Sequence, residues 1–295
     1  MSSQGKKTLT VFTPTYNRAE LLNTLWDSLL ANYQDNHSVE WLVIDDGSTD
    51  ATREVVGDIG REHPDLVRYL WVANGGKHRA INLAANLAAG DWVLIVDSDD
   101  HFKAGALQRI IDTISRVDGN KNIGVIRGLG EFTSKTAQPQ FNLARCGDTC
   151  ASWLSSGQQF DAVTVIRRSV LQSHPFPEYA GEKFMAESWL WFDIDKTHKT
   201  CFVNERWIVC SYRLDGLTAQ SRRLRMKSPR SAMAVYENVV QAQVSRGLRA
   251  RASANWWRYA FHAGRHVGSD RNVRVPVRWA PFGFALFALD VIGNR

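Results

Sequence analysis

Residues 92–101, which read W-V-L-I-V-D-S-D-D-H, constrain this chain more than any other stretch. An apolar run rich in β-branched residues leads directly into a segment that contains Asp97, Asp99 and Asp100. A short continuous apolar run is typical of a central strand that is buried on both faces. Carboxylates crowded at the end of such a strand repel one another unless a cation lies between them. The stretch therefore predicts a site for Mg²⁺ or Mn²⁺, which prefer oxygen ligands. By itself it also fits a solvated acidic turn that caps a helix over 103–116.

Length and composition place the chain among ordinary globular proteins. Its 295 residues suffice for one large α/β domain, or for one domain with a smaller appendage, and 44% are hydrophobic and 22% charged. No apolar run approaches the roughly 18 residues of a membrane-spanning helix, and residues 1–7 lack the apolar core of a signal peptide. The four cysteines show no zinc-site spacing, so we expect reduced thiols in a cytoplasmic protein.

The net charge of +6 is unevenly distributed along the chain. Residues 1–205 carry 20 basic and 26 acidic side chains, whereas residues 206–295 carry 16 and 4. A basic terminal segment indicates contact with an anionic surface: membrane headgroups, nucleic acid or a polyanionic acceptor. The alternative is a solvated, arginine-rich helical surface.

One unit recurs four times in the first hundred residues: a short apolar strand, a polar loop and a helix. The predicted strands cover 9–13, 41–44, 67–72 and 92–96, and Asn17 with Glu20 predicts a capping box for the first helix. Strands that alternate with helices indicate a parallel sheet, and such sheets bind ligands at the carboxyl ends of their strands. One crevice is therefore expected to contain Thr13, Thr15, Asp45, Asp46, Asn74, Lys77, His78, Asp97 and Asp99.

The two common phosphate-binding motifs are missing from this crevice. No G-x-G-x-x-G follows the first strand, and the chain has no G-x-x-x-x-G-K-[ST]. A phosphate would instead be held by a metal on the acidic pair and by Lys77, His78 or Arg79, with help from the backbone of Gly75 and Gly76.

Four motifs together resemble the family 2 glycosyltransferases of the GT-A fold. They are T-P-T-Y-N-R at 13–18, V-I-D-D-G-S-T-D at 43–50, N-G-G-K-H-R-A-I-N at 74–82 and V-D-S-D-D at 96–100. They occur in the family's order and spacing, and the resemblance covers roughly residues 8–220. It implies a Rossmann-like, mostly parallel sheet flanked by helices.

The resemblance also implies roles for individual residues in the crevice. Positions that match the nucleotide-binding residues of the family are Thr13, Thr15, Asp45, Asn74, Lys77, His78, Asp97 and Ser98. Asp97 and Asp99 match the D-x-D motif, which holds Mn²⁺ or Mg²⁺ on the donor's diphosphate. Whether Asp99 or Asp100 is the main metal ligand stays open at this point.

A further acidic segment lies in the second half of the chain. Residues 181–192, G-E-K-F-M-A-E-S-W-L-W-F, look like the family segment that places a carboxylate against the acceptor. Glu187 matches the catalytic base, although many members carry Asp at the next position, where this chain has Ser188. Glu182 is the weaker candidate. The alternative for Glu187 is a structural role as a helix cap or ion-pair partner.

The C-terminal segment is predicted to be separate from the catalytic part. We expect a catalytic domain over 1–229 and a basic, amphipathic helical appendage over 230–295. Residues 280–293 are apolar but too short to span a bilayer, and Arg274, Arg278 and Trp279 precede them. This pattern predicts peripheral attachment to the inner face of the cell membrane. Packing on the catalytic domain or on a second copy in a homodimer is the alternative.

Together these features predict an inverting glycosyltransferase. A sugar would pass from a nucleotide-sugar, with UDP expected from the resemblance, to a hydroxyl of a glycan or lipid-linked acceptor in bacterial surface-glycan synthesis. A sugar-phosphate nucleotidyltransferase and a non-catalytic scaffold of the same fold are the alternatives. Nucleic-acid binding is not expected, because it leaves the acidic crevice unexplained and no binding motif is present. The donor sugar, the acceptor and the linkage are not determined by the sequence.

Overall fold

The computed structural model describes residues 7–34, 38–132, 145–156, 162–211, 213, 215–264 and 275–293. The chain forms two compact units. The first unit contains Met1–Asp148, Phe160–Pro175 and His198–Tyr212, and the second contains Thr149–Gln159, Phe176–Thr197 and Arg213–Arg295. The units are interleaved along the chain, and the expected boundary after residue 229 stays a prediction.

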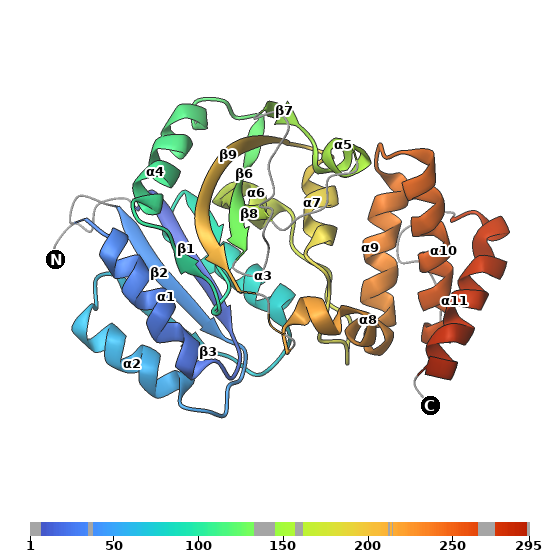
Figure 1. Ribbon diagram of the computed structural model, residues 1–295, viewed down its shortest axis with the longest axis horizontal. Coiled ribbons are helices and arrows are strands. Elements are labelled where there is room, and N and C mark those ends of the chain that lie inside the picture. Colours follow the sequence, from blue (N-terminus) through green and yellow to red (C-terminus); the bar gives the residue numbers. More distant parts are fainter. Residues whose placement is uncertain are drawn as a thin grey trace. The chain divides into compact units, whose positions relative to one another are not determined.

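The first four strands form the parallel half of the sheet in the first unit. They are β1 (Leu9–Thr15), β2 (Val39–Asp45), β3 (Val67–Trp71) and β4 (Trp92–Ile95). Their order is β3-β2-β1-β4, and every neighbouring pair is parallel. Helices α1 (Ala19–Asn32), α2 (Thr52–Glu62) and α3 (Lys77–Leu87) connect them (Figure 1). The predicted succession of strand, loop and helix is therefore confirmed.

The other half of the sheet is mixed. It contains β5 (His101–Phe102), β6 (Ile123–Phe132), β7 (Cys146–Asp148), β8 (Ala162–Arg167) and β9 (Lys199–Cys210). Strand β8 runs antiparallel to both β4 and β6, whereas β6 and β9 are parallel. Helices α4 (Ala106–Val117) and α6 (Arg168–Ser173) complete the unit. The overall class, a sheet flanked by helices, is the predicted one.

The core of the first unit explains why these strands form. All seven residues of β1 and of β2 are buried, as expected for central strands covered on both faces. Helix α1 buries Leu22, Leu25 and Leu29 at helical spacing, and α1 and α2 cover one face of the sheet (Figure 1). Trp26 of α1 stacks on Trp41 of β2 with ring centroids 5.3 Å apart.

The predicted capping box at the start of α1 is wrong. Asn17 has a φ of 52°, and its side-chain oxygen accepts a hydrogen bond from the backbone N–H of Thr49. Helix α1 is instead capped from a distance, because Asp50 accepts the N–H of Ala19 at 3.1 Å and also that of Thr52 in the first turn of α2. One carboxylate therefore serves the beginnings of two helices.

The expectation of four reduced thiols is also wrong. Cys146 and Cys201 form a disulfide within the first unit. The cysteines are 55 positions apart in sequence, but the antiparallel pairing of β7 with β9 places them directly opposite each other. Sequence spacing alone could not reveal this pair, since the contact arises from strand pairing.

The second unit is helical. Its elements are α5 (Cys150–Ser155), α7 (Ser188–Ile194), α8 (Leu217–Lys227), α9 (Pro229–Gln241), α10 (Arg246–Ala263), the 3₁₀ turn η1 (Val277–Trp279) and α11 (Ala280–Gly293). Tyr236 of α9 stacks on Tyr259 of α10, and α10 packs against both α9 and α11. The predicted C-terminal helices are thus present. Among the described helices, none combines the length and apolar character needed to cross a bilayer.

Candidate functional site

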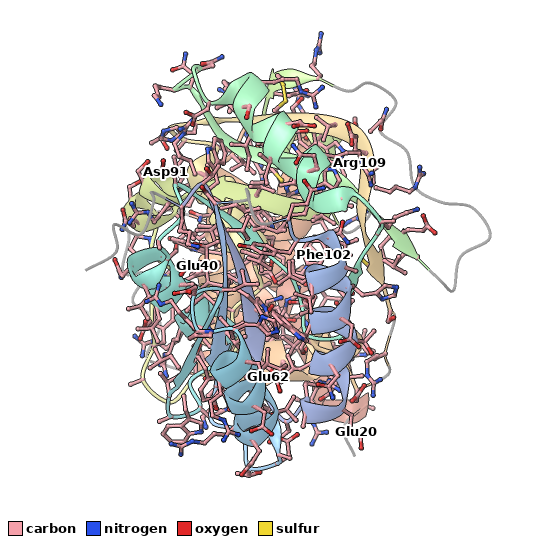
Figure 2. The ribbon with its side chains drawn as sticks, turned by 90° about the vertical axis from the view of Figure 1, so that its left-hand side faces the viewer. Glu20, Glu40, Glu62, Asp91, Phe102 and Arg109 are labelled. Carbon is pink, nitrogen blue, oxygen red and sulfur yellow. A yellow bond between two sulfur atoms is a disulfide. The ribbon has the colours of Figure 1, made fainter. Side chains whose placement is uncertain are left out.

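The crevice predicted from the sequence lies where the parallel strands end. Register places Thr15 of β1 beside Asp45 of β2, and Asp97 follows β4, the other neighbour of β1. In Figure 2, Glu20 in the first turn of α1, the helix that follows β1, lies far from Asp91, which directly precedes β4. The polar loops after β1, β2 and β4 therefore share one edge of the sheet.

Asp45 is a buried carboxylate held in a fixed orientation. Its Oδ2 accepts a hydrogen bond from the hydroxyl of Tyr69 at 2.6 Å, and its Oδ1 accepts the backbone N–H of Ser48 at 2.8 Å. Burial and the neighbouring Asp45 both raise the pKa of Tyr69, so this phenol remains a donor. Asp45 is thereby positioned rigidly at the end of β2.

The two threonines of β1 differ in how their hydroxyls are used. The Thr13 hydroxyl accepts a hydrogen bond from Nε1 of Trp41 at 3.0 Å, so it is engaged within the core. The Thr15 hydroxyl is buried and has no hydrogen-bond partner among the residues that the structure describes. A buried polar group without a partner is costly and suggests that a ligand satisfies it. Of the two, Thr15 is the better placed to contact a nucleotide.

Asp46 organises the loop after β3, a role that the sequence did not reveal. Its carboxylate accepts the backbone N–H groups of Gly75 at 2.7 Å and Gly76 at 2.8 Å, and also contacts the Asn74 amide. Gly47 makes this close approach possible, because a Cβ there would lie 2.7 Å from the backbone nitrogen of Asn74. The sequence does contain a signal for this role, namely two adjacent aspartates followed by a glycine. The motif does not reveal which of the two carboxylates binds the next loop.

Lys77 and His78 begin helix α3 directly after this loop. Gly76 precedes them with a φ of 99°, a conformation that glycine adopts readily. The Lys77 ammonium forms an ion pair with Oδ1 of Asp97, and the His78 side chain is buried. The structure therefore joins two predicted site residues that are 20 positions apart.

The three aspartates after β4 are close enough to influence one another, and Ser98 between them is buried. Burial, reinforced by the charge of Asp97, raises the pKa of Asp99, while Arg18 and Lys77 oppose this rise. Burial and the charges of Asp97 and Asp99 raise the pKa of Asp100 to about 8. Asp100 also accepts the backbone N–H of Ser211 at 3.4 Å.

These carboxylates fit a divalent cation that is completed by a ligand. Among the described residues, no group of three or more His, Cys, Asp or Glu side chains is arranged to hold a metal ion. Mg²⁺ and Mn²⁺, however, commonly use one or two carboxylates together with phosphate oxygens of the substrate. Burial and, after it, the charges of neighbouring aspartates raise the pKa values of Asp99 and Asp100, and a cation bound between the carboxylates would stabilise their ionised forms. The donor set therefore suits a metal–diphosphate complex.

The acidic residues expected to act on the acceptor belong to the second unit. Glu182 is buried, and its two oxygens accept the backbone N–H groups of Arg230 at 2.9 Å and Ser231 at 2.7 Å. It therefore caps the start of α9. Glu187 is half-buried and immediately precedes α7. With Glu182 committed to a helix cap, Glu187 is the better candidate for the base.

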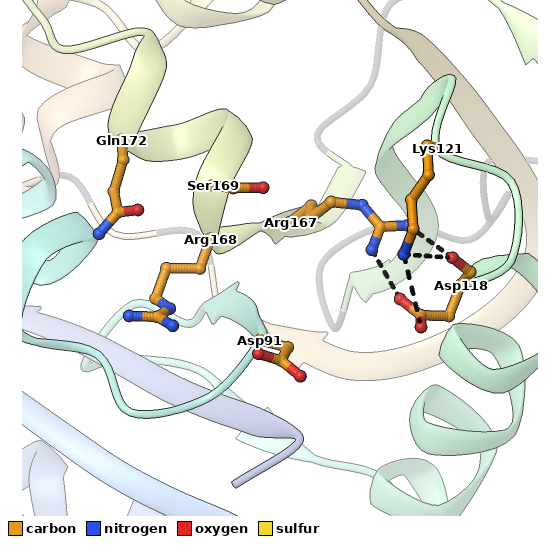
Figure 3. A pocket seen from close by; sticks show the side chains of 7 residues that line it. All are labelled: Asp91, Asp118, Lys121, Arg167, Arg168, Ser169 and Gln172. Atoms are coloured by element: carbon orange, nitrogen blue, oxygen red, sulfur yellow. Dashed lines mark hydrogen bonds and ion pairs between the residues drawn. The ribbon is translucent and has the colours of Figure 1, made fainter. Parts of the chain in front are cut away.

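A hollow at the opposite edge of the sheet is not part of this crevice. It has a volume of ≈ 320 Å³ and is lined by Asp91, Asp118, Lys121, Arg167, Arg168, Ser169 and Gln172 (Figure 3). Arg167 forms an ion pair with Asp118 at 2.6 Å and lies over the ring of Trp92, 4.4 Å from its centroid. Since Asp91 precedes β4 whereas Asp97 follows it, the hollow and the acidic cluster lie at opposite ends of that strand. The Arg167–Asp118 pair holds β8 against the end of α4.

Comparison with known proteins identifies the family to which this geometry belongs. The profile described as "Glycosyl transferase family 2" matches residues 10–168, which cover β1 to β8 and the whole acidic edge. This chain belongs to glycosyl transferase family 2. An uncharacterized glycosyltransferase of Nostoc sp. is 34% identical over 110 residues, which make up 37% of this chain and 34% of the relative. The chain spans about a third of the length of the first curated relatives it matches.

A longer alignment links this family 2 chain to a Campylobacter jejuni enzyme. The GalNAc(5)-diNAcBac-PP-undecaprenol beta-1,3-glucosyltransferase of that organism is 28% identical over 218 residues, 71% of this chain and 67% of the enzyme.

Solved structures show the same fold at low sequence identity. Residues 1–349 of Staphylococcus aureus TarS, solved in complex with UDP-GlcNAc, give a TM-score of 0.65 at 18% identity, with 96% of this chain and 81% of that chain covered. The mannosyltransferase PcManGT of Pyrobaculum calidifontis, in complex with GDP-Man and Mn²⁺, gives a TM-score of 0.56 at 16% identity, with 99% and 77% covered.

Proposed function

We propose that this protein is an inverting glycosyltransferase that moves a sugar from a nucleotide-sugar to an acceptor hydroxyl. The observation that carries the proposal is the cluster of Asp97, Asp99 and Asp100 beside Lys77 at the end of β4, in a chain of glycosyl transferase family 2. Carboxylates and an ammonium at one point suit a metal-bound diphosphate, since they offer both ligands for the cation and a charge for the phosphates.

The nucleoside is proposed to bind at the ends of β1 and β2. At this edge the Thr15 hydroxyl can donate a hydrogen bond to the base or ribose, and the fixed Asp45 carboxylate can accept one. Because the fold already holds these groups rigidly, little conformational entropy has to be lost on binding. The backbone N–H groups of Gly75 and Gly76 donate hydrogen bonds to Asp46, so the expectation that they help to hold a phosphate is wrong.

The departure of the nucleoside diphosphate is the step that the acidic cluster and Lys77 are proposed to assist. Asp97 and Asp99 would hold Mn²⁺ or Mg²⁺, which supplies charge stabilisation to the diphosphate when bound. Release of the diphosphate concentrates negative charge near Lys77, and its ammonium stabilises that charge. The anomeric carbon passes through an oxocarbenium-like state as the glycosidic bond breaks.

Glu187 is proposed to take the proton from the acceptor hydroxyl while that oxygen attacks the anomeric carbon from the opposite face. Inversion follows from this single displacement. Ser188 occupies the position at which many family members carry Asp, and this substitution leaves the base role to Glu187. The hydrogen bonds of Glu182 to the start of α9 support that assignment, since both its oxygens are already used.

UDP is the proposed nucleotide, and a glycan or lipid-linked saccharide of a bacterial surface polymer is the proposed acceptor. Support comes from the similarity to an enzyme named for an undecaprenol-linked saccharide and from the likeness in fold to TarS with UDP-GlcNAc. Mn²⁺ is a proposed cofactor because PcManGT was solved with GDP-Man and Mn²⁺.

The decisive experiment measures release of UDP from a panel of UDP-sugars, with Mn²⁺ or with EDTA. Slow, metal-dependent hydrolysis by the wild type that is lost in Asp99→Ala would support the donor site even before an acceptor is known. Release of pyrophosphate from a sugar phosphate and a nucleoside triphosphate would favour a nucleotidyltransferase instead. If no nucleotide-sugar binds or is turned over with any metal tested, the alternative of a non-catalytic scaffold is favoured.

A further inference from the structure

Helix α11 is apolar on all sides except at one residue. Asp290 is the only charged side chain in Ala280–Gly293, and it is fully buried. Its Oδ1 accepts a hydrogen bond from Nε of Arg222 at 2.9 Å, and its Oδ2 lies 2.6 Å from Nε of Arg258 and 2.9 Å from Nε2 of His262. These contacts tie α11 to α8 and α10 within the second unit.

The buried carboxylate determines which side of α11 faces outward. Gly283, seven residues before Asp290 and therefore on the same side of the helix, packs so closely on α10 that a Cβ would collide with Trp257. The remaining surface of the helix carries Phe282, Leu289 and Ile292, whose exposed fractions are 60%, 60% and 69%. Phe284 and Val291 extend this surface at 54% and 41%. We call these five residues the α11 apolar face.

The part of the chain that carries the α11 apolar face is rich in positive charge. The described residues from 213 to 293 include eleven Lys or Arg and three Asp or Glu, and one of the three acids is the buried Asp290. Arg278 is exposed two residues before the helix begins and lies over the ring of Trp279, 5.9 Å from its centroid. Arg222 is 60% exposed although it contacts Asp290, and Arg223 beside it is exposed. An exposed apolar surface bordered by arginines and a tryptophan is suited to the boundary between headgroups and acyl chains.

We propose that the α11 apolar face docks on an anionic lipid bilayer, with α11 lying in the plane of the interface. The apolar side chains enter the acyl boundary, while Arg278, Trp279 and Arg223 remain at the level of the headgroups. Asp290 makes this possible because its ion pairs remove the helix's only negative charge from the outward side. The inference concerns a surface outside the acidic crevice and does not depend on the proposed function.

A second copy of the chain is the less suitable occupant of this face. In a symmetric dimer the same patch would meet itself, so the arginines around each α11 would approach those of the other copy. Like charges brought together in this way cost free energy, whereas anionic headgroups would pair with them. Charge complementarity therefore favours the bilayer.

Flotation of the full chain with vesicles tests the proposal. The wild type is expected to float with mixed phosphatidylglycerol–phosphatidylcholine vesicles at low salt, and much less with phosphatidylcholine alone. Less of the Leu289→Asp/Ile292→Asp variant should float with the vesicles. We expect its affinity for them to fall about tenfold or more, because two apolar anchors become charged. Arg278→Glu should weaken binding roughly fivefold or more and reduce its salt dependence. Leu30→Asp, which charges a 37% exposed leucine of α1 in the first unit, is the matched control and should bind as the wild type does.

Thermal unfolding of each variant shows whether it remains folded. Failure of the wild type to float with anionic vesicles would overturn the proposal, as would flotation of a folded Leu289→Asp/Ile292→Asp variant at the wild-type level. If light scattering instead finds a wild-type dimer that this variant converts to a monomer, and no vesicle binding occurs, the face is an interface between copies and the proposal is wrong. UDP release without an acceptor should be the same in all four proteins, so failure here is separate from failure of the glycosyltransferase proposal.

Discussion

The ammonium of Lys77, on the first turn of α3, forms an ion pair with Oδ1 of Asp97, just beyond the end of β4. The contact joins two motifs of the sequence and provides a positive charge beside the three aspartates. The Lys77 side chain is 16% exposed and that of Asp97 is 47% exposed, so the ammonium is held in place while the carboxylate remains open to a ligand.

Replacement of Lys77 should therefore impair the donor site. Because charge-assisted hydrogen bonds contribute about 1.5–3 kcal/mol, we expect Lys77→Met to lower kcat/KM for the donor roughly tenfold to hundredfold. Lys77→Arg should restore part of this loss, since it keeps the charge but not its position. Lys121→Met, which removes a lysine at the opposite edge of the sheet, should retain wild-type kinetics. Equal activity of Lys77→Met and wild type would exclude Lys77 from diphosphate binding.

Asp99 and Asp100 should respond differently to neutralisation. Asp99→Asn is expected to reduce UDP release roughly hundredfold and to raise the Mn²⁺ concentration needed, because a metal ligand is lost. Asp100→Asn should keep more activity. Its melting temperature in EDTA should rise, because burial and the charges of Asp97 and Asp99 disfavour the ionised form of Asp100 and the amide removes that cost. Manganese titrations and calorimetry of both variants provide the comparison. The reverse order of activities would make Asp100 the main ligand.

The two glutamates of the second unit separate catalysis from stability. Glu187→Gln should abolish sugar transfer while donor binding, measured by calorimetry, is unchanged, because only proton removal is lost. Glu182→Gln should lower the free energy of unfolding by about 1–3 kcal/mol, since its charged oxygens cap α9, and should transfer sugar normally once folded. Normal transfer by Glu187→Gln would reassign the base.

Gly47 should be intolerant of even the smallest side chain. Its φ is +84°, and an added Cβ would lie 2.7 Å from the backbone nitrogen of Asn74, so Gly47→Ala must displace the loop that Asp46 holds. We expect a loss of stability of about 1–3 kcal/mol and an increased KM for the donor. Gly57→Ala is the matched control, because this glycine lies in α2 with open space around it and alanine favours helix by up to about 1 kcal/mol. Denaturant unfolding of both variants measures the two changes in stability. Equal changes in the free energy of unfolding would contradict the prediction.

Asp290 should make the stability of the second unit depend on acidity. Burial opposes its ionisation, but the hydrogen bonds from Arg258, His262 and Arg222 outweigh that effect and hold the pKa of Asp290 well below its usual value. The carboxylate therefore contributes stability above the unfolded pKa of 3.8, and this contribution is lost as the pH falls toward the folded pKa. The difference in melting temperature between wild type and Asp290→Asn should be large at neutral pH and shrink below about pH 4. A difference that stays constant with pH would contradict this account.

The sequence determined those features that depend on neighbours along the chain. Apolar runs followed by polar loops gave the four parallel strands, and the edge at which Asp45, Asp97 and Asp99 gather follows from the geometry of parallel sheets. The four motifs were sufficient for the family, because each is a contiguous group of residues. Helices at the C-terminus were likewise predictable from their periodicity.

Only the tertiary structure decided which partner each polar group takes. Asp46 rather than Asp45 holds the glycines of the next loop, and Asp50 displaces the local cap that Asn17 and Glu20 suggested. Cys146 meets Cys201 through strand pairing, and the outward side of α11 is selected by arginines on other helices that surround Asp290. In each case the partner is remote in sequence. The free energy of burying a polar group depends on whether the fold brings that partner within hydrogen-bonding distance. A local pattern of residues carries no record of such a contact.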